Sequence, residues 1–194
     1  MKHFQLEGQI REVGNKAVIK AFRRQGLGPC NLYGKGVDNI LFTVKEKDLK
    51  GLLYTPASFI VDLKLSDGKT YTAITHELQF HPVDDNCLHI DFLAVSADKP
   101  IAIDVPITIT GHAAGVQAGG KFTLVSRKLR VSALMENLPD ELPVDITNLQ
   151  LDKAISAGDV HFENVTILSP KTTVICRVKS TRQMLAAAKA EAEA

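Results

Sequence analysis

Hydrophobic and polar residues alternate along much of this chain, and the alternating runs predict β-strands. The clearest run places apolar residues at every second position from residue 101 to residue 109, which is the period of a strand with one buried face. Runs rich in β-branched and aromatic residues predict further strands at residues 4–10, 40–44, 58–65, 70–75, 88–95, 129–134 and 172–178. The chain is therefore predicted to be mainly β.

Helical patterns are few. Residues 45–54 form the best candidate, with Gly51 and Pro56 near their end, and residues 17–24 form a shorter one. Between the strands expected at 58–65 and 70–75 lies an Asp-Gly pair, Asp67-Gly68, which favours a hairpin turn. These elements predict an α+β fold in which strands dominate.

The pattern restarts near residues 97–100, which predicts a boundary between two domains. We expect a first domain at residues 1–97 and a second at residues 98–179 that is a compact β-sandwich or small barrel. The remaining residues, 180–194, are rich in Ala, Glu and Lys. They favour helix but offer little apolar surface to bury, so we expect a frayed helix or a disordered tail.

Composition limits the class of protein. The chain has 194 residues, of which 45% are hydrophobic and 23% are charged, as in a globular protein with a sizeable core. It holds no apolar stretch of the length that a membrane helix needs, and its start lacks the apolar core of a signal peptide. The three cysteines are far apart, which fits a reducing compartment. We therefore expect a cytoplasmic protein without a membrane segment.

Positive charge is concentrated at the amino-terminal end. The first 36 residues hold seven Lys or Arg and two Glu, a net charge of +5, although the whole chain carries only +1. Six glycines lie in the same stretch, together with Tyr33. We expect an irregular backbone there that can approach a polyanion closely. A polarised charge of this kind suggests one acidic partner, and a solvated surface without a partner is the equally weighted alternative.

One predicted strand carries Cys87, His89 and Asp91 at alternate positions, so all three side chains are expected on the same face of a sheet. With His76 and His81 nearby, they are the best candidates for a metal site or a hydrolase. The spacing matches no established zinc pattern. Side chains two apart on a strand also project in parallel and do not converge on one substrate atom. We therefore expect no enzyme activity, no metal and no cofactor, and keep this set as the alternative.

The same strand also suits recognition of RNA. A carboxylate such as Asp91 can accept hydrogen bonds from base amino groups, and His89 can stack on a base or bind a 2′-hydroxyl. Tyr33 and the Arg23-Arg24 pair would supply stacking and neutralise phosphates. The glycines of residues 111–120 lack the Lys and Ser or Thr that end a phosphate-binding loop, and turn geometry explains them better.

Several short motifs follow one another in a recognisable order: Arg11, residues 23–26 (RRQG), 32–34 (LYG), 79–82 (QFHP), 89–92 (HIDF) and 115–120 (GVQAGG). In this order and spacing the chain resembles the bacterial large-subunit ribosomal proteins that bind 5S rRNA, in the long form known as general stress protein CTC. The resemblance covers nearly the whole chain. It implies a first domain that is a small closed β-barrel with helices, followed by a β-rich second domain.

The resemblance also implies a site. The first domain is expected to grip the loop E region of 5S rRNA, chiefly from the minor-groove side. A monomer within the large ribosomal subunit is expected, its second domain contacting neighbouring rRNA or protein. Two segments depart from the family. Residues 16–22 are less rich in Arg, so fewer phosphate contacts are expected, and residues 29–32 are less apolar, so no role is assigned to Cys30 or Asn31. The residues expected to contact RNA are Arg11, Lys16, Lys20, Arg23, Arg24, Tyr33, Gln79, His89 and Asp91.

Overall fold

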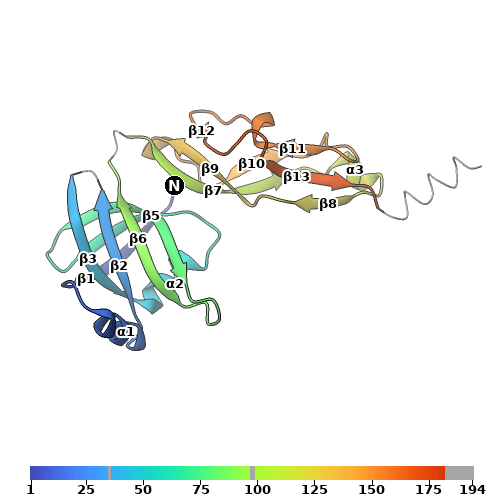
Figure 1. Ribbon diagram of the computed structural model, residues 1–194. Coiled ribbons are helices and arrows are strands. Elements are labelled where there is room, and N and C mark those ends of the chain that lie inside the picture. Colours follow the sequence, from blue (N-terminus) through green and yellow to red (C-terminus); the bar gives the residue numbers. More distant parts are fainter. Residues whose placement is uncertain (35, 97–98, 182–194) are drawn as a thin grey trace, which may run out of the picture. The chain divides into compact units, whose positions relative to one another are not determined.

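The computed structural model describes residues 1–34, 36–96 and 99–181, and its chain divides into two compact units. The first unit consists of Met1–Ile103 with Leu134–Leu138, and the second of Asp104–Ala133 with the residues from Pro139 onward. Figure 1 shows the barrel of the first unit and the sheets of the second. Most of the predicted tail, from residue 182 onward, lies outside the described residues.

The first unit is a closed six-stranded barrel, as the family resemblance implies. Its strands are hydrogen-bonded in the order β1-β3-β2-β6-β5-β4, and β4 closes on β1. The β1–β4 and β2–β6 pairs are parallel, whereas β1–β3, β2–β3, β4–β5 and β5–β6 are antiparallel. The strands are β1 His3–Ile10, β2 Leu27–Gly34, β3 Val37–Lys45, β4 Ile60–Leu65, β5 Thr70–Phe80 and β6 Cys87–Ala94.

Alternate residues of these strands fill the barrel interior. Phe42 and Phe92 are fully buried, with ring centroids 5.8 Å apart. Position 8 is a glycine beside Phe42, because a Cβ atom there would lie 2.6 Å from the Phe42 ring. The predicted strands of this unit are present, and β5 continues five residues beyond the predicted end.

Strand β2 corrects one expectation. Its sequence, LGPCNLYG, was expected to have irregular backbone, but it is a central strand with neighbours on both sides. Its glycines serve close packing. A Cβ atom at Gly28 would lie 2.9 Å from Leu49, and one at Gly34 would lie 2.9 Å from both the Cβ and the carbonyl oxygen of Ala94. Because these positions need small residues, β2 lacks the alternation of hydrophobic and polar residues by which the neighbouring strands were predicted.

Two helices flank the barrel, both close to their predicted positions: α1 Lys16–Arg24 and α2 Glu46–Leu53. Asn15 begins α1, because its side-chain oxygen accepts hydrogen bonds from the backbone N–H groups of Ala17 and Val18, as an N-cap residue does. Helix α2 buries Leu49 and Leu52, whereas α1 buries no residue fully. The cations of α1 are therefore left at the surface.

The second unit contains two sheets, one with the strand order β10-β7-β9-β12 and the other with the order β11-β13-β8. The segment of residues 111–120 includes a four-residue helix, α3 Ala114–Gln117, that the sequence did not predict. A Cβ atom at Gly115 would come within 2.7 Å of the backbone of residues 150 and 151. Close packing thus explains this glycine. The strands are β7 Ile101–Thr110, β8 Lys121–Leu124, β9 Lys128–Ala133, β10 Leu142–Asp145, β11 Ala154–Ser156, β12 Thr166–Ile167 and β13 Val174–Lys179.

Candidate nucleic-acid interface

The side chains of β6 divide between the barrel interior and its outer face. Cys87 is 7% exposed and belongs to the core, together with Ile90 and Phe92, whereas the side chains of His89 and Asp91 are 25% and 21% exposed. A β-bulge causes the change of face, because Gln79 pairs with His89 but Phe80 pairs with Cys87, which leaves one extra residue between them. The expectation that Cys87, His89 and Asp91 share one face is therefore wrong.

His89 and Asp91 lie on the outer face between two neighbouring strands. On β5, Gln79 is directly opposite His89, and Glu77 is opposite Asp91. On β2, the residue aligned with Asp91 is Asn31. Nδ1 of His89 lies 3.4 Å from a carboxylate oxygen of Asp91. The outer face of β5, β6 and β2 thus brings hydrogen-bonding side chains from three strands together. We call this set the outer-face row; it consists of Glu77, Gln79, His89, Asp91 and Asn31.

Tyr33 lies at one end of this row, two residues after Asn31 on the same strand. A hydrogen bond of 3.0 Å joins its hydroxyl to Nδ1 of His76, and the two rings meet edge to face. Partial burial, followed by the carboxylates of Asp91 and Glu77, raises the pKa of the tyrosine above its usual value. The phenol therefore remains neutral at physiological pH, with its ring half-buried beside the row.

Arg23 connects helix α1 to β6. Its Nε and Nη2 atoms donate hydrogen bonds of 3.1 and 2.8 Å to the carbonyl oxygen of Leu88, the extra residue at the bulge. A guanidinium has five N–H donors, so this contact leaves others for a ligand. Of the remaining predicted cations, Lys16, Lys20 and Arg24 are exposed on the same helix. The bulge that turns His89 outward thus also holds the cationic helix in place.

Arg11 and Asn31 each carry a buried polar atom that has no hydrogen-bond partner among the described residues, Nε of Arg11 and Oδ1 of Asn31. Burial lowers the pKa of the Arg11 guanidinium. The backbone N–H of Arg11 donates to the carbonyl oxygen of Leu41, the residue aligned with Asn31 on β3. The chain therefore holds an unused donor and an unused acceptor close to the outer-face row.

Sequence reasoning missed three members of this surface. Asn31 received no role, and Glu77 and His76 were not included among the RNA contacts. Their places depend on the register of β2 and β5 against β6, and no motif signals that register. The alignment of Asn31 with Asp91 joins residues that are sixty positions apart in the chain.

The side chains of the alternative metal or hydrolase set do not converge on one point. His76 binds Tyr33, while Nδ1 of His81 lies 3.4 and 3.2 Å from the backbone nitrogens of Val83 and Asp84. Burial raises the pKa of Cys87 to about 11, so its thiol is not an activated nucleophile. Across the part of the chain that the structure describes, there is no group of three His, Cys, Asp or Glu placed to hold a metal ion.

Two family models match this chain and together cover most of it. Residues 6–92 match the Ribosomal L25p family, and residues 100–182 match the C-terminal domain of ribosomal protein TL5. The chain belongs to the Ribosomal L25p family. The family resemblance inferred from the motifs is therefore confirmed, and because this is a family of ribosomal proteins, the chain is a structural protein and not an enzyme.

Several relatives match this chain over nearly its whole length. The "Large ribosomal subunit protein bL25" of Porphyromonas gingivalis is 44% identical over 188 residues, which cover 97% of this chain and 98% of the relative. The protein of the same name from Azobacteroides pseudotrichonymphae is 42% identical, over 94% and 96% of the two chains. That from Bacteroides thetaiotaomicron is 40% identical, over 98% of each.

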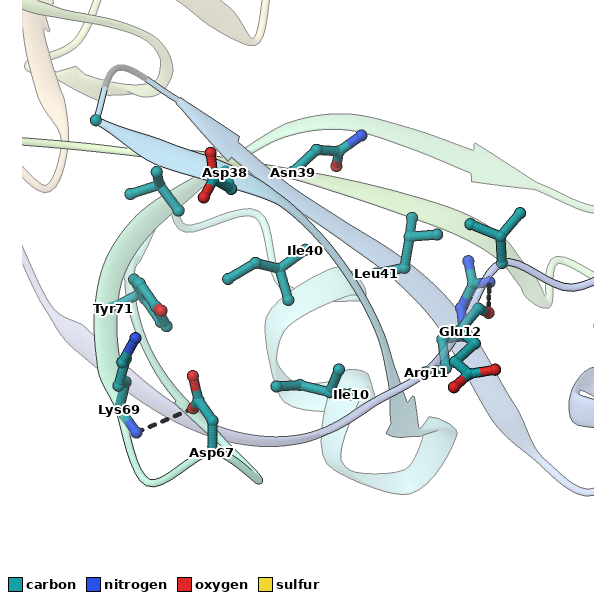
Figure 2. A pocket seen from close by; sticks show the side chains of 13 residues that line it. Ile10, Arg11, Glu12, Asp38, Asn39, Ile40, Leu41, Asp67, Lys69 and Tyr71 are labelled. Carbon is teal, nitrogen blue, oxygen red and sulfur yellow. Dashed lines mark hydrogen bonds between the residues drawn. The ribbon is translucent and has the colours of Figure 1, made fainter.

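A separate hollow of about 790 Å³ lies on the barrel of this L25p-family protein, beside β3 and the β4–β5 turn. Figure 2 shows Ile10, Ile40 and Tyr71 around it, with Arg11 at one side. The carboxylate of Asp67 accepts a hydrogen bond from the backbone N–H of Lys69. Arg11 is the only predicted contact residue among those that line it, so the hollow is distinct from the outer-face row.

Among the described helices, none is long and apolar enough to cross a membrane.

Proposed function

We propose that this protein is a component of the large ribosomal subunit that binds 5S rRNA through the outer-face row and helix α1. One observation carries the proposal: the bulge at Leu88 turns His89 and Asp91 outward, beside Tyr33, and also anchors Arg23. The names of the relatives, which describe large-subunit proteins, support the assembly. The proposed contact residues are Arg11, Lys16, Lys20, Arg23, Arg24, Tyr33, Gln79, His89 and Asp91.

The chemistry of the surface suits folded RNA. A-form RNA has a wide, shallow minor groove that exposes 2′-hydroxyls and base edges, and side chains that stand on a sheet can reach into such a groove. Asp91 would accept hydrogen bonds from base amino groups, and His89 and Gln79 would bind sugars or base edges. The cations of α1 would neutralise phosphates on the flank.

The location follows from this role. The protein would act as a monomer within the ribosome, in the cytoplasm of a bacterium. We propose residues 1–97 as the 5S rRNA-binding domain and residues 98–179 as a domain that contacts neighbouring rRNA or protein. No role is proposed for residues 180–194.

Asp91 provides the sharpest test, because two hypotheses predict opposite changes in RNA affinity when its carboxylate is removed. If this end of the barrel is only a generic basic surface, then removal of a carboxylate strengthens RNA binding. If Asp91 contacts a base, Asp91→Ala weakens 5S rRNA binding by about 10-fold, the value of a hydrogen bond to a charged group, and leaves the salt dependence almost unchanged. Filter binding at several salt concentrations, with tRNA as competitor, measures both quantities.

Two further variants complete the design. Arg24→Ala should reduce the slope of log affinity against log salt by about one, because one phosphate contact is lost. Asp38→Ala, which removes an exposed carboxylate from β3, serves as the matched control and should bind like the parent. The proposal fails if Asp91→Ala binds as tightly as Asp38→Ala, or if tRNA competes as well as 5S rRNA.

A further inference from the structure

The three-stranded sheet of the second unit has one apolar face and one cationic face. Phe122 and Leu124 of β8 pair with Val178 and Cys176 of β13, and the latter two are buried. The alternate residues of the same two strands therefore point to the opposite face. On that face Lys121 lies opposite Lys179, and Thr123 lies opposite Arg177. We call these four residues the β8–β13 face; its three cations are exposed.

The pairing of Lys121 with Lys179 is unfavourable for the isolated protein. Like charges that lie directly opposite each other on antiparallel strands destabilise a sheet. Within the described residues, neither ammonium group has an ion pair or hydrogen bond recorded to relieve the repulsion, and the guanidinium of Arg177 has none either. The like-charge pair thus lowers stability without a compensating contact in the part of the chain that the structure describes, and such an arrangement is typical of a surface that binds an anion.

One carboxylate lies close to this face. Asp152 precedes β11, the other neighbour of β13, and its Oδ1 accepts a hydrogen bond of 3.0 Å from the backbone N–H of Ser180. That contact orients the carboxylate toward the backbone beyond the end of β13. The three cations outweigh the negative charge of Asp152 and leave the face positively charged.

We propose that the β8–β13 face binds the phosphate backbone of RNA. This proposal rests on the proposed function, in that the RNA is taken to be that of the large ribosomal subunit. Lysine and arginine side chains and a threonine hydroxyl are the groups that proteins use for phosphate oxygens. Arg177 can bind a phosphate in two-pronged fashion, with Lys121 and Lys179 as point charges beside it.

The composition of the face favours RNA over an acidic protein. The cores of protein–protein interfaces are enriched in aromatic residues and depleted in lysine. The apolar residues that pair between β8 and β13, Phe122 with Val178 and Leu124 with Cys176, are on the opposite face. The outward residues thus offer charge and hydrogen bonds but no apolar anchor, as expected for contacts to a nucleic-acid backbone.

Lys121→Glu separates a functional role from a structural one. The change replaces a repulsive pair with a cross-strand Glu–Lys pair, so we expect the melting temperature to rise by about 1–3 °C. If the face binds phosphates, the same variant should be released from large ribosomal subunits at a lower salt concentration than the parent. Lys128→Glu, an equal charge change on β9 of the other sheet, is the control and should alter neither quantity.

A cross-linking experiment identifies the partner. The three native cysteines are buried, so Thr123→Cys can be labelled selectively with a benzophenone. The labelled protein is bound to large subunits depleted of the native protein and is then irradiated. We expect cross-links that nuclease digestion removes. Cross-links only to protein, no cross-link, or equal effects of Lys121→Glu and Lys128→Glu would overturn the proposal.

The affinity of the same labelled protein for isolated 5S rRNA is measured in parallel. Failure of that binding would contradict the proposed function of the first unit. Loss of the RNA cross-link with 5S rRNA binding intact would contradict only the β8–β13 proposal. The two failures are therefore distinguishable.

Discussion

Both units expose cations, on helix α1 in the first and on a β-sheet in the second, but different kinds of side chain lie beside them. In the first unit the cations of α1 flank the outer-face row of a histidine, amides and carboxylates, with Tyr33 at its end. In the second unit the β8–β13 face offers only cations and a hydroxyl. Carboxylates on an RNA-facing surface weaken general electrostatic attraction, so they are useful only where they accept specific hydrogen bonds. The first surface is therefore suited to distinguish one RNA from another, and the second to bind the phosphates of any RNA.

The largest effects are expected from substitutions that remove a buried side chain from the core of one unit at a time. Phe92→Ala empties part of the barrel interior and should lower the free energy of unfolding by about 3–5 kcal/mol, and Ile175→Ala should cost about 2–5 kcal/mol in the second unit. Only Phe92→Ala is expected to weaken 5S rRNA binding. Urea unfolding and filter binding without denaturant measure the two effects. Equal losses of binding would show that recognition is not confined to the first unit.

Tyr33 tests whether the first surface uses stacking. Tyr33→Ala should reduce 5S rRNA affinity by about 1–3 kcal/mol if the ring stacks on a base. Tyr33→Phe retains the ring but removes the hydroxyl that meets His76, and should cost only about 0.5–1.5 kcal/mol. Competition binding with labelled 5S rRNA compares the variants. Equal losses would assign the role to the hydroxyl, and parental binding by both would remove Tyr33 from the site.

The smallest expected effect is the reactivity of the cysteine thiols, which are buried in the interiors of both units. Burial raises the pKa of Cys87 to about 11 and also raises the pKa values of Cys30 and Cys176. A thiol with a pKa near 11 is only about 0.1% thiolate at pH 8. We therefore expect negligible reaction of the native protein with Ellman's reagent at pH 8, and release of three equivalents after unfolding. Rapid reaction of one thiol would reveal local opening of its unit.

The strands with regular alternation were predictable, and β2 was not. Residues 101–110 are predicted and observed as one strand, because Ile101, Ile103 and Val105 are buried at every second position. Strand β2 is surrounded by neighbours that need glycine for close approach, as at Gly28 and Gly34. Packing requirements there removed the periodic signal. Short strands such as β11 and β12, with three and two residues, are also too brief to show a period.

The candidate site was predictable in part. The motifs and their family resemblance supplied the proposed contact residues, and those of β5, β6 and β2 are brought together on one outer face. The error at Cys87 arose because simple alternation assumes an unbroken ladder. A bulge inserts one residue and reverses the face of everything beyond it, and neither Leu88 nor its neighbours signal one.

The β-rich character, both main helices, the concentration of positive charge and the family could all be predicted from the amino-acid sequence. These depend on local periodicity, on composition and on the order of motifs, all of which are written along the chain. Three other facts emerge only from the folded chain: Asn31 aligns with Asp91, Cys87 faces the core, and Lys121 lies opposite Lys179. These facts depend on the register between strands distant in sequence, and register is set by how the side chains of the whole unit pack together.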